Sequence, residues 1–309
     1  MKLSLALATY NEEKNIRDCI ESYRGLAEEV IVVDGTSTDK TVEIAKSLGA
    51  KVIVTSNPSM FHINKQKAID ACSGDWILQL DADERVTPEL AAEIKKVISM
   101  DGKTLEEYEN NLSDKKLFFR HELVTGGRTE AVKEQSREPR RLNEFNAFFI
   151  PRLNYFLGKY LRHGGVYPDG VIRLFKRGKA HLPCKDVHEL MRVDGKTGWL
   201  QNPLKHIDSP TFSRYLERNS RYIDHLAKDL LCNTQHVIRN IKNNKFKMLH
   251  VTCYMLYVGI NWICCKPLSW FFMTTFRHKG ILDGWQGIVF SFFSALRFPR
   301  AYWRAMRRF

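Results

Sequence analysis

The sequence lacks the cysteine pattern of a disulfide-stabilised secreted protein. Its seven cysteines, at positions 19, 72, 184, 232, 253, 264 and 265, include no CxxC pair. An odd number of scattered cysteines indicates reduced thiols in a cytosolic protein. A signal peptide is not expected either, because the apolar run at residues 3–8 is too short for its core and no small-residue cleavage site follows. We therefore expect a chain that is not exported.

Acidic residues are scarce in the last quarter of the chain. Residues 236–309 hold twelve Lys or Arg and a single acid, Asp283, whereas residues 1–235 are close to neutral. A nucleic-acid-binding protein, which is one alternative, would cluster its basic residues in a recognition module. Here they flank apolar blocks. The pattern therefore favours an anionic membrane surface, and not nucleic acid, as the partner.

Long hydrophobic runs are few. Residues 248–265 contain no Asp, Glu, Lys or Arg, and this length is the lower limit for a membrane-spanning helix. Two further apolar blocks, at 268–276 and 288–298, are rich in aromatic residues and have basic residues beside them. This pattern is typical of helices that lie in the membrane interface. We expect residues 236–309 to form a basic, aromatic, helical region attached peripherally or monotopically to the cytoplasmic face of the inner membrane. The alternative is a buried helical subdomain or a dimer interface.

Strands and helices alternate over the first hundred residues. Apolar segments indicate strands at 3–8, 30–33, 51–55 and 76–80. Amphipathic segments indicate helices at 15–23, 41–48, 62–72 and 88–100. The last of these helices has Thr87 as its N-cap and Pro88 at its first position. The order predicts an α/β fold with a largely parallel sheet covered by helices on both faces.

The alternation stops at residue 101. Residues 101–147 are rich in charge and poor in apolar periodicity, which predicts an inserted mobile segment with few helical residues. Strands are expected again at 148–150 and 171–175, and a helix at 211–231. We expect a catalytic domain over residues 1–235, followed by the helical region 236–309.

Polar side chains follow the first two predicted strands. Thr9, Tyr10 and Glu12 offer a hydroxyl, a ring and a carboxylate that can hold a base and a ribose. Asp34 can accept a hydrogen bond from the ring N–H of a pyrimidine. Ligands of open α/β sheets bind beyond the carboxyl ends of the strands, where these residues are expected. The alternative is a capped turn before each helix, and for Asp34 the two roles are compatible.

Two carboxylates, Asp81 and Asp83, follow the fourth predicted strand. Side chains alternate along an extended chain, so both carboxylates lie on one side. Hard oxygen donors that face a diphosphate suit Mn²⁺ or Mg²⁺. An isolated DxD pair is common on protein surfaces. At the end of a buried strand, downstream of the two earlier motifs, it predicts a metal and nucleotide site.

These three motifs, in this order, resemble those of the family 2 glycosyltransferases, whose GT-A fold is a Rossmann-like sheet flanked by helices. The resemblance covers roughly residues 3–100. It implies donor-nucleotide contacts for Thr9, Tyr10, Glu12 and Asp34. It also implies a ribose or metal contact for Asp81 and a metal ligand in Asp83.

Two further features bear on this resemblance. Lys65 and Lys67 stand where the family has a basic residue near the nucleotide. Gly35 replaces the second Asp that is usual in the family's second motif, which leaves Asp34 as the only carboxylate at that place.

Later segments resemble a subgroup that contains lipopolysaccharide-core glucosyltransferases. They are residues 150–159, 163–169, 173–175, 187–189 and 280–287. The resemblance implies an inverting hexosyltransferase that uses a nucleotide sugar, by default a UDP-sugar. Its acceptor would be a glycan or a lipid-linked molecule in the synthesis of the bacterial envelope. A nucleotidyltransferase on a similar sheet is the alternative, but the chain lacks that class's Gly-rich basic loop near the N-terminus.

Glycosyl transfer needs one general base for the acceptor hydroxyl. We expect Glu189 to be that base, with Asp186 as the second candidate, because the resemblance places their segment under the acceptor. The alternative for Glu189 is a surface ion-pairing acid. His181, Cys184 and His188 have a spacing that suggests zinc, but no fourth ligand follows at a typical interval. His188 is instead expected to contact a donor phosphate.

Overall fold

A computed structural model describes residues 1–124, 144–184, 191–241 and 247–308. The chain divides into two compact units. The first, here called the sheet unit, comprises Met1–Leu153 and Pro168–Ile207. The second, the helical unit, comprises Asn154–Tyr167 and Asp208–Phe309. This division differs from the predicted one, which placed the boundary at residue 235.

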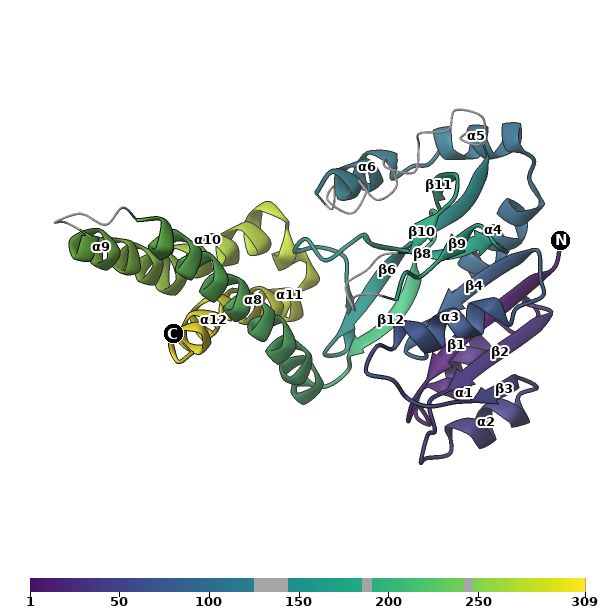
Figure 1. The fold of residues 1–309 in the computed structure, drawn as a ribbon. Helices are drawn as coiled ribbons and strands as arrows, with labels where there is room; N and C mark the ends of the chain where they lie inside the picture. Colours follow the sequence, from purple (N-terminus) through teal and green to yellow (C-terminus); the bar gives the residue numbers. More distant parts are fainter. Residues whose placement is uncertain (125–143, 185–190, 242–246, 309) are drawn as a thin grey trace. The chain divides into compact units, whose positions relative to one another are not determined.

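The first half of the sheet unit follows the predicted alternation of strands and helices (Figure 1). Its strands are β1 (Leu3–Thr9), β2 (Glu29–Asp34), β3 (Lys51–Val54) and β4 (Trp76–Leu80). They are parallel and lie in the order β3-β2-β1-β4. The helices between and after them are α1 (Ile16–Ser22), α2 (Thr41–Ser47), α3 (His62–Asp70) and α4 (Pro88–Ser99). Thr87 caps α4 as predicted, because its Oγ1 accepts a hydrogen bond from Leu90 N at 3.2 Å.

Later strands, together with one short strand from the first half of the chain, extend this sheet through several antiparallel pairs. Beyond β4 the order continues β8-β6-β12-β5. These strands are β8 (Asp169–Lys176), β6 (Phe145–Phe156), β12 (Leu204–Ser209) and β5 (Glu84–Arg85). A further strand, β11 (Lys196–Trp199), pairs in parallel with β6, and β9 (Ala180–His181) with β10 (Arg192–Val193) forms a separate ribbon. The pairing of β8 with β4 brings a distant part of the sequence beside the DxD strand.

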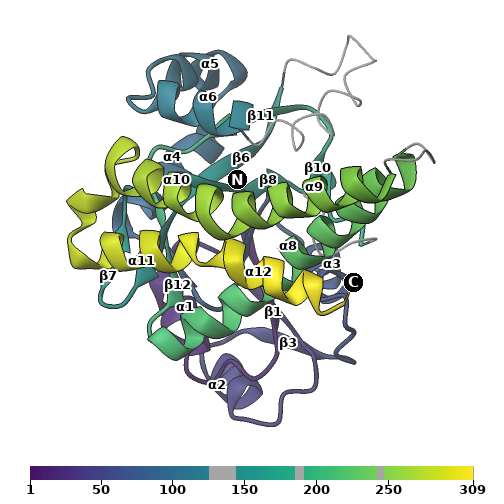
Figure 2. The same cartoon turned by 90° about the vertical axis from the view of Figure 1, so that its left-hand side faces the viewer.

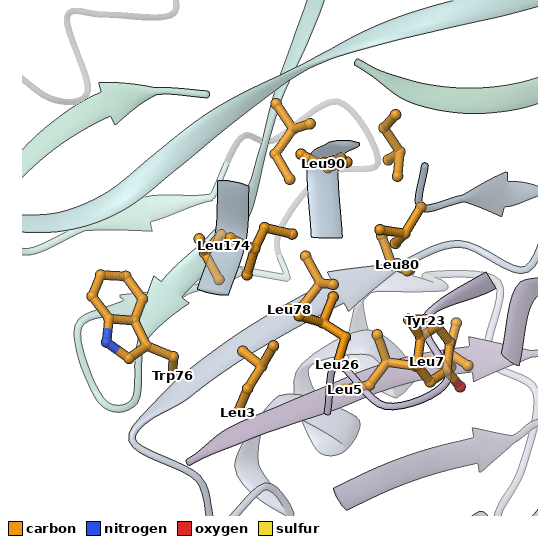
Figure 3. Close-up of a cluster of buried hydrophobic side chains, with 14 of the residues drawn as sticks. Leu3, Leu5, Leu7, Tyr23, Leu26, Trp76, Leu78, Leu80, Leu90 and Leu174 are labelled. Carbon is orange, nitrogen blue, oxygen red and sulfur yellow. The ribbon is translucent and has the colours of Figure 1, made fainter. Parts of the chain in front are cut away.

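The hydrophobic core lies on both faces of β1 and β4. Leu3, Leu5 and Leu7 point into one cluster, together with Leu78 and other residues of β4, α1 and α4 (Figure 3). Ala6 and Ile77 belong to a second cluster on the opposite face. Because both central strands are buried on both faces, they read as continuous apolar runs. The carboxyl ends of β1 and β4 are therefore held by the packed core on both faces.

The segment after α4 is more helical than predicted. It contains α5 (Gly102–Asn110) and α6 (Lys115–Val124), while residues 125–143 lie outside the described residues. Asp101 caps α5 by accepting a hydrogen bond from Thr104 N at 2.8 Å. The buried ring of Phe118 stacks on Trp199, with 4.4 Å between the ring centroids. Only a few buried apolar residues hold these helices in place. So small a number produces no clear apolar periodicity in the sequence.

The helical unit is built around the long helix α8 (Phe212–Asn240), whose start was predicted but which extends beyond the expected end. Its other elements are β7 (Lys159–Leu161), α9 (Lys247–Ile260), η2 (Asn261–Cys265), α10 (Lys266–Phe272), η3 (Met273–Arg277), η4 (Gly280–Asp283), α11 (Trp285–Ala295) and α12 (Arg297–Met306). Apolar residues of α8 pack against Val258 of α9 and against Ala301 and Ala305 of α12. The ribbons of α8 and α12 lie side by side (Figure 1 and Figure 2). Because α8 runs unbroken through residue 235, no boundary falls there.

One helix among the described residues, Met248–Arg277, is long and apolar enough to cross a membrane. Only 11% of its most apolar window is buried within the protein. Val258 and Thr274 face the interior, whereas large apolar side chains at regular helical spacing are exposed. These are Leu249, Leu256, Ile260, Leu268, Phe272 and Phe276. The exposed face of this helix is therefore an apolar face.

Candidate active site

The loops after β1 and β2 are tied together by one buried carboxylate. Asp34 accepts hydrogen bonds from Thr9 Oγ1 at 2.9 Å and from the backbone N and Oγ of Ser37 at 2.8 and 2.6 Å. Asp34 is fully buried. Its carboxylate therefore holds the two loops together from the interior of the sheet unit. Its contact with a donor nucleotide stays a prediction.

Above Asp34 the two loops adopt unusual backbone conformations. Asn11 and Thr36 have φ values of 54° and 62°, in the left-handed region that a β-branched residue such as Thr36 rarely enters. Hydrogen bonds hold this geometry, since Asn11 N donates to Ser37 Oγ at 2.8 Å and Asn11 Oδ1 accepts from Thr38 N at 2.8 Å. Strained, well-held loops of this kind cluster at ligand sites.

Two of the predicted donor contacts lie on the first loop. Tyr10 is 47% exposed, so its ring is available for stacking on a nucleobase. Glu12 is partly buried, and its Oε2 accepts a hydrogen bond from Asn15 Nδ2 at 2.7 Å. Both residues therefore lie at the carboxyl end of β1, as the sequence predicts.

The structure also gives a reason for Gly35, which replaces the usual Asp. A Cβ atom at this position would lie 3.0 Å from Cβ and Oδ1 of Asn57. A contact that short requires the Asn57 side chain to shift. The Asn57 side chain thus occupies the space that a side chain at position 35 would need.

Asp81 is held by two cations. Its Oδ1 lies 2.5 Å from Lys65 Nζ, and its Oδ2 lies 2.6 Å from Arg173 Nη2. Burial alone would raise the pKa of Asp81, but the charges of Arg173 and Lys65 hold it well below its ordinary value. Asp81 is therefore ionised, and each of its carboxylate oxygens already contacts a cation. Lys67, the second predicted lysine, is exposed and donates to Thr55 Oγ1 at 2.9 Å.

Arg173 is the centre of a larger buried network. Its Nη1 donates to Gln79 Oε1, and its Nη2 donates to Oε1 of the fully buried Glu84 at 2.7 Å. The same Glu84 oxygen lies 3.5 Å from Arg152, whose Nη2 donates to Asp169 Oδ2 at 2.7 Å. The three cations Lys65, Arg152 and Arg173 thereby match the carboxylates of Asp81, Glu84 and Asp169. The sequence predicted no role for Glu84, Arg152 or Arg173, although a charged residue inside an apolar strand is a signal for the two arginines.

Asp83 has a different partner from Asp81. Its side chain is 26% exposed, much as that of Asp81 is at 28%, and its Oδ2 lies 3.5 Å from Nε2 of the buried His206. Its carbonyl oxygen accepts a hydrogen bond from Ile207 N at 2.8 Å, which fixes the DxD turn against β12. No group of three or more His, Cys, Asp or Glu side chains in the described part of the chain is arranged to hold a metal. A single partly exposed carboxylate fits Mn²⁺ or Mg²⁺ when ligand phosphates and water complete the coordination.

The predicted bases cannot be compared with the structure. Asp186, His188 and Glu189 lie outside the described residues. Their roles as base candidates and phosphate contact stay predictions.

A comparison with protein families matches residues 4–165 to glycosyl transferase family 2. Among curated relatives, an uncharacterized glycosyltransferase of Rickettsia bellii is 44% identical over 99 residues, which is 32% of this chain and 33% of that protein. The glycosyltransferase SunS of Bacillus subtilis is 28% identical over 241 residues, 74% of this chain and 53% of that protein. The chain thus spans about a third of the length of the Rickettsia relatives that it matches.

Similar solved structures include glucosyl-3-phosphoglycerate synthase from Mycobacterium tuberculosis with phosphoglyceric acid. It is 25% identical with a TM-score of 0.29, over 33% of this chain and 41% of that one. The same enzyme with Mn²⁺ and UDP-glucose gives 25% identity and a TM-score of 0.28, over 33% of this chain and 40% of that one.

We predict that Arg173→Gln lowers the free energy of unfolding by about 3–5 kcal/mol near neutral pH, because it leaves the fully buried Glu84 and the partly exposed Asp81 without their main cation. In the parent, Arg173 and Lys65 hold the pKa of Asp81 well below its ordinary value, so the ionised carboxylate stabilises the fold at neutral pH, and this contribution is lost as the pH falls. The variant lacks the part due to Arg173, so its loss relative to the parent shrinks as the pH falls below about 4, the ordinary pKa of an Asp. Urea unfolding near neutral pH and at about pH 3 measures this change.

The matched control is Arg177→Gln, which removes an exposed guanidinium at the end of the same strand. It should cost about 1 kcal/mol or less at either pH. An Arg173→Gln variant with the same loss at both pH values would contradict the claim that Arg173 keeps Asp81 charged.

Proposed function

Because the chain belongs to glycosyl transferase family 2 and has the GT-A fold, we propose that it is an inverting, metal-dependent hexosyltransferase. Its donor is a nucleotide sugar, by default a UDP-sugar. Its acceptor is a hydroxyl of a glycan or of a lipid-linked molecule. One observation carries the proposal: the partly exposed Asp83 stands at the carboxyl end of β4, on the same sheet edge as the strained loops of β1 and β2.

The donor nucleotide binds over the loops that follow β1 and β2. The exposed ring of Tyr10 offers a stacking surface for the base, and Glu12 offers a carboxylate for the ribose. Asp34 and Thr9 hold both loops in place from the interior. Lys65, already in contact with Asp81, brings positive charge to the side of the site where a diphosphate would bind.

A bound Mn²⁺ or Mg²⁺ would act as a Lewis acid that stabilises the leaving nucleoside diphosphate. Asp83 would hold this ion together with the donor phosphates. Asp81 serves the site differently, by fixing Lys65 and Arg173. This arrangement needs one carboxylate for the metal and none as a general acid.

Glu189 is the proposed general base, and Asp186 is the second candidate. The base takes the proton of the acceptor hydroxyl while that oxygen forms a bond to the anomeric carbon. The bond from the same carbon to the diphosphate oxygen breaks, and its electron pair leaves with the diphosphate. A single displacement of this kind inverts the anomeric configuration. His188 is proposed to contact a donor phosphate.

We further propose that the enzyme works at the cytoplasmic face of the bacterial inner membrane, in the synthesis of lipopolysaccharide or another envelope glycan. The support is the exposed apolar face of the Met248–Arg277 helix, where Leu256, Leu268 and Phe272 are 61%, 59% and 56% exposed. Soluble monomers rarely leave apolar faces of this kind in contact with water. A lipid-linked acceptor would then lie in the same plane as the enzyme.

Asp83→Asn keeps the shape of the side chain and removes the charge that holds a divalent ion. We predict loss of sugar transfer and of metal-dependent binding of a nucleoside diphosphate, with an unchanged unfolding curve. Asp70→Asn, an exposed change on α3, is the control and should behave as the parent protein. Full sugar transfer by Asp83→Asn, or by the parent protein in excess EDTA, would contradict the proposed metal dependence.

Glu189→Gln tests the base. We predict near-normal donor binding and a fall in kcat of about 10²–10⁴-fold, the usual contribution of a general base. Single-turnover transfer measures it, with Asp186→Asn assayed beside it. If Glu189→Gln remains within a few-fold of the parent and Asp186→Asn is inactive, the base is Asp186.

Leu268→Ser/Phe272→Ser tests the apolar face. Each side chain contributes about 1.5–3 kcal/mol when it is buried in an apolar phase, so we predict at least about a tenfold loss of partitioning onto lipid vesicles. The control, Ile53→Ser/Val54→Ser, removes exposed apolar side chains from β3 and should leave vesicle binding unchanged. Parent protein that does not sediment with vesicles at low salt would contradict membrane attachment.

A further inference from the structure

Two distant segments of the helical unit meet at one buried carboxylate. Asp283 accepts hydrogen bonds from the backbone N of Arg162 at 3.0 Å and of His163 at 2.8 Å. Its Oδ1 also lies 3.0 Å from His163 Nδ1, which leaves the second ring nitrogen of His163 directed away from the carboxylate. A backbone hydrogen bond of 2.8 Å joins Gly164 N to His278 O. The loop after β7 is therefore fixed against the turn between η3 and α11.

Glycines make this junction close. A Cβ atom at Gly280 would lie 2.7 Å from the carbonyl oxygen of Thr274, and one at Gly164 would lie 3.7 Å from Gly280 Cα. At Gly165, where φ is 79°, a Cβ atom would lie 3.8 Å from the His278 ring. Packing of this kind leaves little room for rearrangement. The backbone of the junction is therefore held in place, and with it the positions from which its side chains extend.

The side chains that this junction presents are nearly all basic. We call them the basic junction: Lys159, Arg162, His163, Arg277, His278 and Lys279. Asp283 is the only acidic residue in the segments 154–167 and 273–285. Within the part of the chain that the structure describes, Lys159, Arg162, Arg277 and Lys279 form no ion pair with a carboxylate. Uncompensated cations on a rigid surface favour an anionic ligand.

Exposed apolar side chains alternate with these cations. Phe276, Ile281, Leu282 and Trp285 are between 46% and 60% exposed. A soluble anion would gain nothing from such neighbours. A nucleic acid would not need the aliphatic side chains of Ile281 and Leu282. A lipid with an anionic head group fits both features, because its phosphate contacts cations where its acyl chains contact apolar residues.

We propose that the basic junction binds the phosphate of an anionic membrane lipid, with Asp283 as the residue that positions Arg162 and His163. The inference deepens the proposed membrane attachment and rests on it. The exposed face of the Met248–Arg277 helix supplies general affinity for a bilayer. The basic junction adds selectivity for phosphate-bearing head groups.

Arg162→Gln/Lys279→Gln is the test variant, because both residues are exposed and neither is part of the donor site. The control, Arg221→Gln/Lys228→Gln on α8, removes the same charge from the same unit. Binding is measured to vesicles of phosphatidylcholine alone, with phosphatidic acid, and with oleate at equal negative charge. We expect the parent and the control to prefer phosphatidic acid over oleate. The test variant should lose about tenfold or more in binding to phosphatidic acid vesicles and keep its binding to phosphatidylcholine.

Equal losses in the test and control variants would overturn the proposal in favour of diffuse electrostatic attraction. So would equal binding of the parent to oleate and phosphatidic acid vesicles. A water-soluble short-chain phosphatidic acid and inorganic phosphate are also titrated by calorimetry. If inorganic phosphate binds the parent as well as the short-chain lipid does, the ligand is a free anion and the lipid assignment fails. Failure of the parent to bind phosphatidylcholine, with the short-chain lipid still bound selectively, would contradict the membrane proposal alone.

Discussion

The guanidinium of Arg173 binds Asp81 and Glu84 in the interior of the sheet unit, and the acidic groups at the end of β4 depend on it. Without this cation, the fully buried Glu84 would lie close to the negative charge of Asp81 with less positive charge beside them. Lys65 and Arg152 complete the compensation, so that Asp81 and Glu84 are structural anions. Within one turn, Asp81 contacts Lys65 and Arg173, whereas Asp83 lies beside His206. This difference is the basis on which Asp83 is proposed as the metal ligand.

Much of the sheet unit could be predicted from the sequence, because its first four strands are short apolar runs separated by helical segments. The same reasoning found Asp81 and Asp83, since their position at the end of a buried strand is visible in the sequence. It did not find the partners of Asp81 and Glu84. Arg173 and Arg152 reach the site through antiparallel pairing of strands far along the chain, and no local periodicity encodes that pairing.

In the helical unit, the helices could be predicted from the sequence, but which of their apolar side chains are buried could not. Val258 faces the interior, whereas Leu256 and Ile260 are exposed. Composition alone left a buried subdomain as an alternative, and the exposed apolar face supports the proposed membrane attachment. Membership of glycosyl transferase family 2 argues against the nucleotidyltransferase alternative. The junction at Asp283 was not anticipated, because it depends on a contact between distant loops.

The central claim is that this chain binds a nucleoside diphosphate at the carboxyl end of its sheet with a divalent metal held by Asp83. Isothermal titration of the full chain with UDP, once with Mn²⁺ and once with EDTA, tests it most directly. The account predicts saturable binding with Mn²⁺ and far weaker binding with EDTA. Equal affinity under both conditions would contradict the metal assignment, and a failure of every nucleoside diphosphate to bind would contradict the donor site itself.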